Sequence, residues 1–231
     1  MLEEEIRRRV EKATVKFTKL GGQGVLVLGG LILTAAHCID YTVTGRMALG
    51  ESYIEPLETI FGDVHASPMM VETVADIAVL EGLDNGVFCD QAKKFEQFCE
   101  AIEPIPIFTG EFEVADYGLV GDDTLPIYKT FDVYAYSHEN RWVQGHATPT
   151  YSCCPISTIG VVWNEQIAGG TSGSAVVNAD GYVLAVISQA VEKPRSEVTI
   201  QTFPDDRLFL IKSCLPMRVL SQITAERTSI E

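Results

Sequence analysis

The sequence predicts an all-β fold in which helices are confined to three segments. Runs of about four to eight apolar and β-branched residues recur along the 231-residue chain, separated by turns rich in Gly, Asp and Pro. Apolar residues repeat at helical spacing near 2–12, 88–102 and 204–227. A chain of this length is able to bury a full hydrophobic core.

The first element is an amphipathic helix over residues 2–12. Three glutamates each precede an arginine by four positions, and this order of charges stabilises a helix. Leu2, Ile6 and Val10 share one face, so the helix is expected to dock on the strands through that face.

Strands are expected on both sides of the central helix. Before it they fall at 14–18, 24–28, 31–34, 42–49, 53–60, 69–73 and 76–80. After it they fall at 117–120, 130–136, 141–146, 157–162, 174–178, 182–188 and 197–202. Pro104 and Pro106 mark the crossing between the two groups. The helix at 88–102 is expected to pack over the seam between them, with an exosite as the alternative.

Charge and composition exclude several classes of function. The net charge of −15 disfavours binding to the phosphate backbone of a nucleic acid. No apolar run approaches the roughly 20 residues that cross a bilayer, so no membrane partner is expected. The N-terminal sequence M-L-E-E-E lacks the positive charge of a secretory signal, which favours a cytoplasmic location. The six cysteines include no C-x-x-C pair and no Cys/His cluster at zinc spacing, so we expect neither a metal nor a cofactor.

Three segments carry the residue types that nucleophilic hydrolysis needs. Residues 169–175, G-G-T-S-G-S-A, present Ser172 in a turn of small residues where backbone amides are able to hold an oxyanion. The apolar strand at 31–34 leads to His37, and Asp76 stands at the mouth of another apolar strand, where a carboxylate needs a partner. Each alone also fits a turn serine, a core histidine or a turn aspartate. The other histidines, at 65, 138 and 146, are expected to be surface or strand residues.

In the order His, Asp, Ser, these segments resemble the chymotrypsin-like (trypsin-fold) serine peptidases, through T-A-A-H-C at 34–38, D-I-A-V-L at 76–80 and G-T-S-G-S at 170–174. The resemblance covers about residues 13–203. It implies two six-stranded antiparallel β-barrels, the first over 13–115 with the inserted helix and the second over 116–203. The helix at 1–12 precedes them, and a helical tail at 204–231 follows.

The resemblance also implies a role for each site residue. Ser172 would be the nucleophile, His37 the base and Asp76 the acid that orients it. The backbone amides of Gly170 and Ser172 would form the oxyanion hole. Ser188 matches the serine that supports the acid and begins the strand that pairs with substrate, although an ordinary strand serine fits equally well.

Several positions depart from the secreted members of that family. Thr171 replaces the aspartate that receives the new N-terminal ammonium after zymogen cleavage, and no Ile-Val-Gly-Gly sequence is present. Cys38 is the first cysteine of the chain, so the bridge that follows the catalytic histidine in that family is impossible. We therefore expect mostly free thiols, and a closer likeness to HtrA-like and trypsin-2 peptidases, which need no such cleavage. The adjacent Cys153 and Cys154 fit a redox device or, more simply, packing.

The residues that would read the substrate leave two specificities open. Gln166 lies six residues before the nucleophile, where the family reads the P1 side chain, and it would favour small or polar groups. If the turn is shifted by one position, Glu165 would line the pocket instead and favour Arg or Lys. Ile187 stands where members that read acidic residues or Gln carry a histidine, which argues against those specificities.

The sequence thus predicts a serine endopeptidase acting on protein or peptide substrates. A catalytically idle peptide-binding or scaffold protein of the same fold is the alternative. An esterase of the α/β-hydrolase type is disfavoured, because its triad runs in the order Ser, Asp, His. Nothing in the sequence indicates an oligomeric state.

Overall fold

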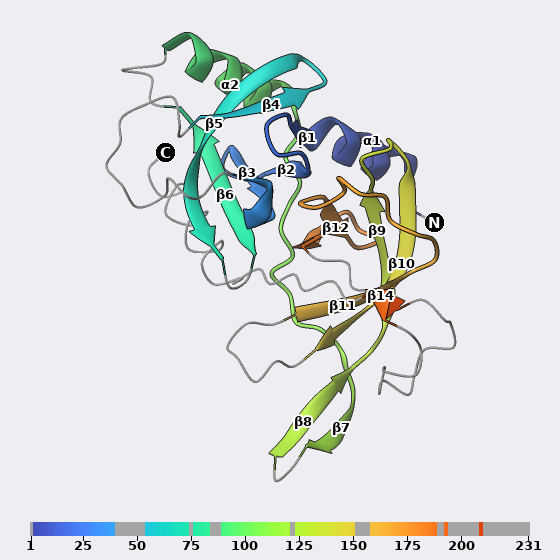
Figure 1. Cartoon of the computed structure of the whole chain (residues 1–231). Coiled ribbons are helices and arrows are strands. Elements are labelled where there is room, and N and C mark those ends of the chain that lie inside the picture. Colours follow the sequence, from blue (N-terminus) through green and yellow to red (C-terminus); the bar gives the residue numbers. More distant parts are fainter. Residues whose placement is uncertain are drawn as a thin grey trace.

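The computed structural model describes residues 2–39, 54–73, 76–83, 89–120, 123–150 and 158–188, with the two-residue strands at 192–193 and 208–209. A closed six-stranded barrel lies beside a second, curled sheet (Figure 1). This mostly β architecture confirms the predicted fold class, but where a second six-stranded barrel was expected the described residues form a five-stranded sheet. The strands expected at 42–49 and 197–202 lie outside the described residues, as do Cys153 and Cys154 and most of the expected helical tail at 204–227. Residues 208–209 of that tail form a strand paired with 192–193, so the helix expected there is wrong at these two positions.

The first barrel is antiparallel throughout. Its strands follow one another around the barrel as β1 (Thr14–Phe17), β2 (Gln23–Val27), β3 (Leu31–Thr34), β6 (Ile77–Gly82), β5 (Gly62–Glu72) and β4 (Glu55–Thr59). Side chains alternate between buried and half-buried along β1, as expected for a strand with one covered face. Every residue of β2 and β3 is buried, because other elements also cover their outer faces.

The second sheet has its own apolar core, which includes Val133, Val161 and Trp163. Its order is β11 (Thr158–Trp163), β10 (Trp142–Thr150), β9 (Phe131–Tyr136), β12 (Ala175–Val177) and β13 (Val183–Val186). A hairpin of β7 (Val114–Val120) and β8 (Asp123–Tyr128) extends away from it (Figure 1). Strand β8 was not predicted, since Pro126 interrupts its pattern. A short pair, β14 (Glu192–Lys193) with β15 (Leu208–Phe209), completes the described strands.

Both predicted helices in the described residues are present. Helix α1 spans Glu4–Ala13 and buries Val10 and Ala13 against the barrel core. Helix α2 spans Cys89–Ala101. It packs against β5 and β6 of the first barrel, so its expected position over the seam is wrong. The ring of Phe95 lies where a side chain at Gly82 would stand, 2.9 Å from an ideal Cβ, so the absence of that side chain lets the helix approach the barrel.

The chain between the two halves ties them together. Ile105 donates its amide to the carbonyl of Leu26 on β2 at 3.0 Å. Next along the chain, the carbonyl of Pro106 accepts from Val183 on β13 at 2.8 Å. Helix α1 adds a side-chain link, because Glu11 Oε1 accepts a 2.7 Å hydrogen bond from Trp142 Nε1 on β10.

The Glu11–Trp142 hydrogen bond yields the first prediction. Glu11→Ala should lower the free energy of unfolding by about 1–2 kcal/mol, because the bond is part-buried and charge-assisted. Glu4→Ala on the same helix is the matched control, since Glu4 pairs with Arg8 in solvent and should change stability by less than about 0.5 kcal/mol. Urea unfolding followed by tryptophan fluorescence measures both, and equal losses would contradict the role given to Glu11.

Candidate active site

The pairing of β3 with β6 brings His37 and Asp76 together. These strands are antiparallel neighbours with Thr34 opposite Ala78, so the end of one lies beside the start of the other. A 3₁₀ turn, Ala36–Cys38, then carries His37 over Asp76. The carboxylate accepts from the His37 backbone amide at 3.0 Å and bonds to Nδ1 of its ring at 2.7 Å.

Asp76 also accepts a hydrogen bond from the second half of the molecule. Ser188, just beyond β13, donates its hydroxyl to Asp76 Oδ2 at 2.5 Å. Asp76 itself has a φ of +56°, in the left-handed region that few side chains adopt. The carbonyl of the same residue accepts from the Ala36 amide at 3.1 Å, which helps to hold that conformation. Backbone strain of this kind is often found at functional sites.

The hydrogen bonds of this cluster shift the pKa of both ionisable groups. Burial alone would raise the pKa of Asp76, but hydrogen bonds from His37 and Ser188 outweigh it and lower the pKa. The hydrogen bond to Asp76, assisted by the Cys38 side chain and opposed by burial, raises the pKa of His37 to about 10. The pair therefore favours an imidazolium beside a carboxylate.

Ser172 lies at the seam between the two halves. Its carbonyl oxygen accepts from the backbone amide of Gln23 on β2 at 2.7 Å and from the Cys38 thiol at 3.5 Å. Among the hydrogen bonds of the described residues, none joins the Ser172 hydroxyl to the His37 ring. Catalytic hydrogen bonds in substrate-free sites are often long and tighten only in the complex.

The predicted oxyanion amides are available. Gly170 has a φ of +84°, a conformation that suits glycine. Within the described part of the chain, the amides of Gly170 and Ser172 donate to no backbone carbonyl. Two unused donors beside a serine hydroxyl are what an oxyanion hole requires.

Thr171 holds this loop in place from inside. It is 1% exposed, and its hydroxyl accepts from the backbone amide of His138 at 3.3 Å. The His138 ring covers Gly170, lying 3.2 Å from where a Cβ would stand. The turn between β9 and β10 thus supports the loop with a neutral contact, where the secreted enzymes would use an ion pair. His138 was expected to be an ordinary surface or strand residue, and this contact was not anticipated.

Glu165 and Gln166 lie on the loop that follows β11. Arg141 pairs with the carboxylate of Glu165 and donates to the carbonyl of Gln166 at 3.1 Å. Hydrogen bonds to Glu139 and then to Glu165 raise the pKa of Arg141, so the guanidinium stays charged. The negative charge of Glu165 is therefore matched by an arginine that the sequence did not point to.

Gln23 is another residue that sequence reasoning missed. It is fully buried, and its carbonyl accepts from the Thr34 hydroxyl at 2.6 Å. Its side-chain oxygen accepts from the Ser174 hydroxyl at 2.6 Å, so it holds the chain that follows Ser172. The glycine-rich sequence G-G-Q-G at 21–24 could have indicated that this segment is tightly packed. A Cβ at Gly22 would stand only 2.4 Å from the Cys38 sulfur.

The described residues contain no group of three or more His, Cys, Asp or Glu side chains able to hold a metal ion. None of their helices combines the length and the apolar character needed to span a bilayer. Cys38 and Cys99 carry free thiols, and burial raises the pKa of Cys99 to about 12.

Comparison with known proteins relates this geometry to solved structures. An inactive serine-to-alanine mutant of Rv3671c from M. tuberculosis superimposes with a TM-score of 0.52 at 14% identity, over 99% of this chain and 92% of that one. The active form of the Rv3671c protease gives 0.52 at 15% identity, over 94% of this chain and 82% of that one. This chain has a chymotrypsin-like protease fold. No protein-family model and no curated protein matches the sequence.

The raised pKa of His37 predicts the pH dependence of the site. A general base must be neutral, and the neutral ring predominates only as the pH rises through about 10. Hydrolysis that uses His37 as its base should therefore continue to accelerate well above pH 7, and Asp76→Asn should lower both its rate, by roughly 10⁴-fold, and the pH of half-maximal rate. Steady-state kcat/KM across pH measures this, and an inflection near the ordinary histidine value in the unmodified protein would contradict it.

The backbone around Gly173, where the two halves meet, leaves no room for a side chain. A Cβ there would stand 2.0 Å from the Gln23 carbonyl oxygen, and φ is +82°. Gly173→Ala should cost roughly 2 kcal/mol or more in the free energy of unfolding. Gly169→Ala, with nothing within 4 Å of its Cβ, is the control and should stay within about 0.5 kcal/mol. Thermal unfolding compares them, and a well-tolerated Gly173→Ala would show that the seam is looser than described.

Proposed function

We propose that this protein is a serine endopeptidase that cleaves protein or peptide bonds through an acyl-enzyme. The observation that carries the proposal is the Asp76 carboxylate, which binds the His37 ring at 2.7 Å beside the loop that holds Ser172. The fold it shares with solved proteases supports the same reaction class.

In the first half-reaction the Ser172 hydroxyl oxygen attacks the scissile carbonyl while Nε2 of His37 takes its proton. The carbonyl π electrons move to oxygen, and the amides of Gly170 and Ser172 stabilise the resulting oxyanion. Asp76 accepts Nδ1–H, fixes the tautomer and stabilises the imidazolium. When the tetrahedral intermediate collapses, the C–N bond breaks and the His37 proton passes to the leaving amine.

In the second half-reaction a water molecule repeats these steps. His37 takes a proton from the water, whose oxygen attacks the acyl carbonyl. The C–O bond to Ser172 then breaks, and the proton returns to the serine oxygen. The products are a carboxylic acid and the free enzyme.

We also propose that the chain needs no zymogen cleavage. In the secreted members of the resembling family, a new N-terminal ammonium orders the oxyanion loop. Thr171 offers no carboxylate for such a group, and its hydroxyl bonds to the His138 amide within the intact chain. This supports a likeness to the HtrA-like and trypsin-2 peptidases.

The catalytically idle scaffold remains the second candidate, favoured by the missing hydrogen bond between His37 and Ser172. Labelling by a fluorophosphonate separates the two, because the probe requires an activated serine. Freshly purified, unprocessed protein should label, and Ser172→Ala should not. Labelling that appears only after loss of residues 1–12 would contradict activity of the intact chain, and no labelling in any form would support the scaffold.

We propose further that the enzyme prefers small or polar P1 residues. A carboxylate selects Arg or Lys only if its charge is free to meet the substrate. Glu165 is instead bound by Arg141, which leaves the neutral side chain of Gln166 to contact the P1 residue.

Peptide-library profiling tests this preference. The unmodified enzyme should not favour Arg or Lys at P1, and Gln166→Ala should change the profile. Arg141→Gln should free the Glu165 carboxylate and raise cleavage after basic residues several-fold. Glu165→Gln serves as the matched control, since it removes that charge. An unchanged profile in all three variants would show that none of these residues reads P1.

A further inference from the structure

The turn between β9 and β10, residues 137–141, contacts both ends of the segment that leads to Ser172. The backbone amide of His138 donates to the Thr171 hydroxyl at 3.3 Å. At the other end of the turn, Arg141 donates to the carbonyl of Gln166 at 3.1 Å. Whatever holds the turn therefore also decides how firmly this segment is placed.

The turn is braced by its own backbone. The Ser137 amide donates to the Arg141 carbonyl at 2.9 Å, and the Asn140 amide donates to the Ser137 carbonyl at 2.9 Å. Asn140 has a φ of +59°, in the left-handed region that asparagine adopts more readily than most residues. A contact that fixes Asn140 therefore also fixes His138, two residues earlier.

Lys16 of the first barrel makes such a contact. Its Nζ donates to Asn140 Oδ1 at 3.0 Å and lies 3.5 Å from the carbonyl oxygen of His138. On β1 it stands between the buried residues Val15 and Phe17, so its side chain points out of the barrel. An ammonium group has three donors, and its charge strengthens each hydrogen bond.

The pairing of β1 with β2 places Lys16 beside the backbone that holds Ser172. Lys16 lies opposite Gln23, whose amide donates to the Ser172 carbonyl at 2.7 Å. The turn that Lys16 contacts covers Gly170, because the His138 ring lies 3.2 Å from where a Cβ would stand. The first barrel thus holds this loop by two routes, through the Ser172 backbone and through the turn.

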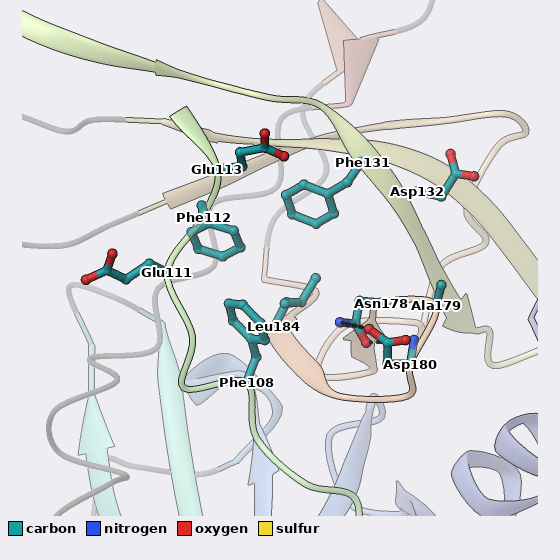
Figure 2. Close-up of a pocket in the computed structure, with 10 residues that line it drawn as sticks. All are labelled: Phe108, Glu111, Phe112, Glu113, Phe131, Asp132, Asn178, Ala179, Asp180 and Leu184. Carbon is teal, nitrogen blue, oxygen red and sulfur yellow. Dashed lines mark hydrogen bonds between the residues drawn. The ribbon is translucent and has the colours of Figure 1, made fainter. Parts of the chain in front are cut away.

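The other end of β9 is held by different means. Phe131, the first residue of the strand, stacks on Phe112 with ring centroids 5.5 Å apart, and Phe108 packs against Phe112 at 5.2 Å (Figure 2). These rings pack against the core of the second sheet. Loss of the Lys16 contact should therefore loosen the turn and leave the sheet folded.

We infer that Lys16 is a positioning residue for the oxyanion hole, acting from the first barrel through the β9–β10 turn. Its contact with Asn140 fixes the turn. His138 on that turn then fixes Thr171 and Gly170, and the Gly170 amide meets the oxyanion. The inference rests on the proposed peptidase activity, because only that reaction gives this amide a catalytic role.

The test compares Lys16→Met with Lys16→Arg in the full-length protein, using acetylation of Ser172 by 4-nitrophenyl acetate. Loss of a whole oxyanion donor costs roughly 10²–10³ in rate, and a loosened donor costs less. We therefore expect Lys16→Met to lower the acetylation rate at saturation by about tenfold, with the half-saturating concentration within about twofold. Lys16→Arg keeps a cationic donor and should stay within about threefold of the unmodified protein.

Exchange of the His138 amide proton, followed by NMR, measures the same link without any substrate. The Thr171 hydroxyl holds this amide, so it should exchange several-fold faster in Lys16→Met. The two readouts separate the two proposals. An unmodified protein that never acetylates Ser172 would contradict the peptidase, whereas unchanged His138 exchange in Lys16→Met would contradict the role of Lys16.

Asn140→Gly locates the contact. Glycine keeps the left-handed backbone and removes the Oδ1 acceptor. The double variant with Lys16→Met should lose no more acetylation rate than Lys16→Met alone, because both changes break the same contact. Additive losses would show that Lys16 acts elsewhere.

Two control variants separate positioning from charge and from stability. Lys129→Met removes the same charge from a residue that pairs with Glu113, and it should leave both readouts unchanged. Phe131→Leu, at the far end of β9, should lower the unfolding temperature and leave the acetylation rate unchanged. A loss in Lys129→Met equal to that in Lys16→Met would reduce the effect to net charge, and an equal loss in Phe131→Leu would reduce it to stability. Either result, or an unchanged rate in Lys16→Met, would overturn the inference.

Discussion

The site depends on the hydrogen bonds that the Asp76 carboxylate accepts. The carboxylate accepts from the ring and amide of His37 in the first barrel and from the hydroxyl of Ser188 in the second sheet. Partial burial of a carboxylate is costly unless its oxygens are bonded, so both partners stabilise Asp76 in this position. The docking of the two halves and the orientation of the His37 ring therefore depend on the same group.

The rest of the seam is arranged around this requirement. Ser172 approaches the first barrel closely enough for its carbonyl to bond to Gln23, and Gly173 fits there only because it has no side chain. Helix α1 and the crossing at Ile105 and Pro106 add contacts outside the site. These contacts fix how the two halves are docked.

Local patterns predicted the fold class and identified two side chains that pair, His37 and Asp76, whereas contacts between distant segments could not be predicted. His37 and Asp76 stand at the ends of apolar strands whose pairing follows from the barrel. The partners of Thr171 and Glu165, His138 and Arg141, lie 33 and 24 residues away along the chain, and their sequence carries no pattern that specifies the contact. The spacing of apolar residues in α2 identified the buried face of the helix but not the strands that this face packs against. The helix was therefore assigned to the wrong surface.

Trapping the acyl-enzyme tests the central claim most directly. The intact protein is mixed with 4-nitrophenyl acetate, quenched in acid within the first turnover, and digested for mass spectrometry. The account predicts an acetyl group on the peptide that contains Ser172, absent from His37→Ala under the same conditions. Release of nitrophenol with Ser172 unmodified, or acetylation that is equal in the His37→Ala protein, would contradict it.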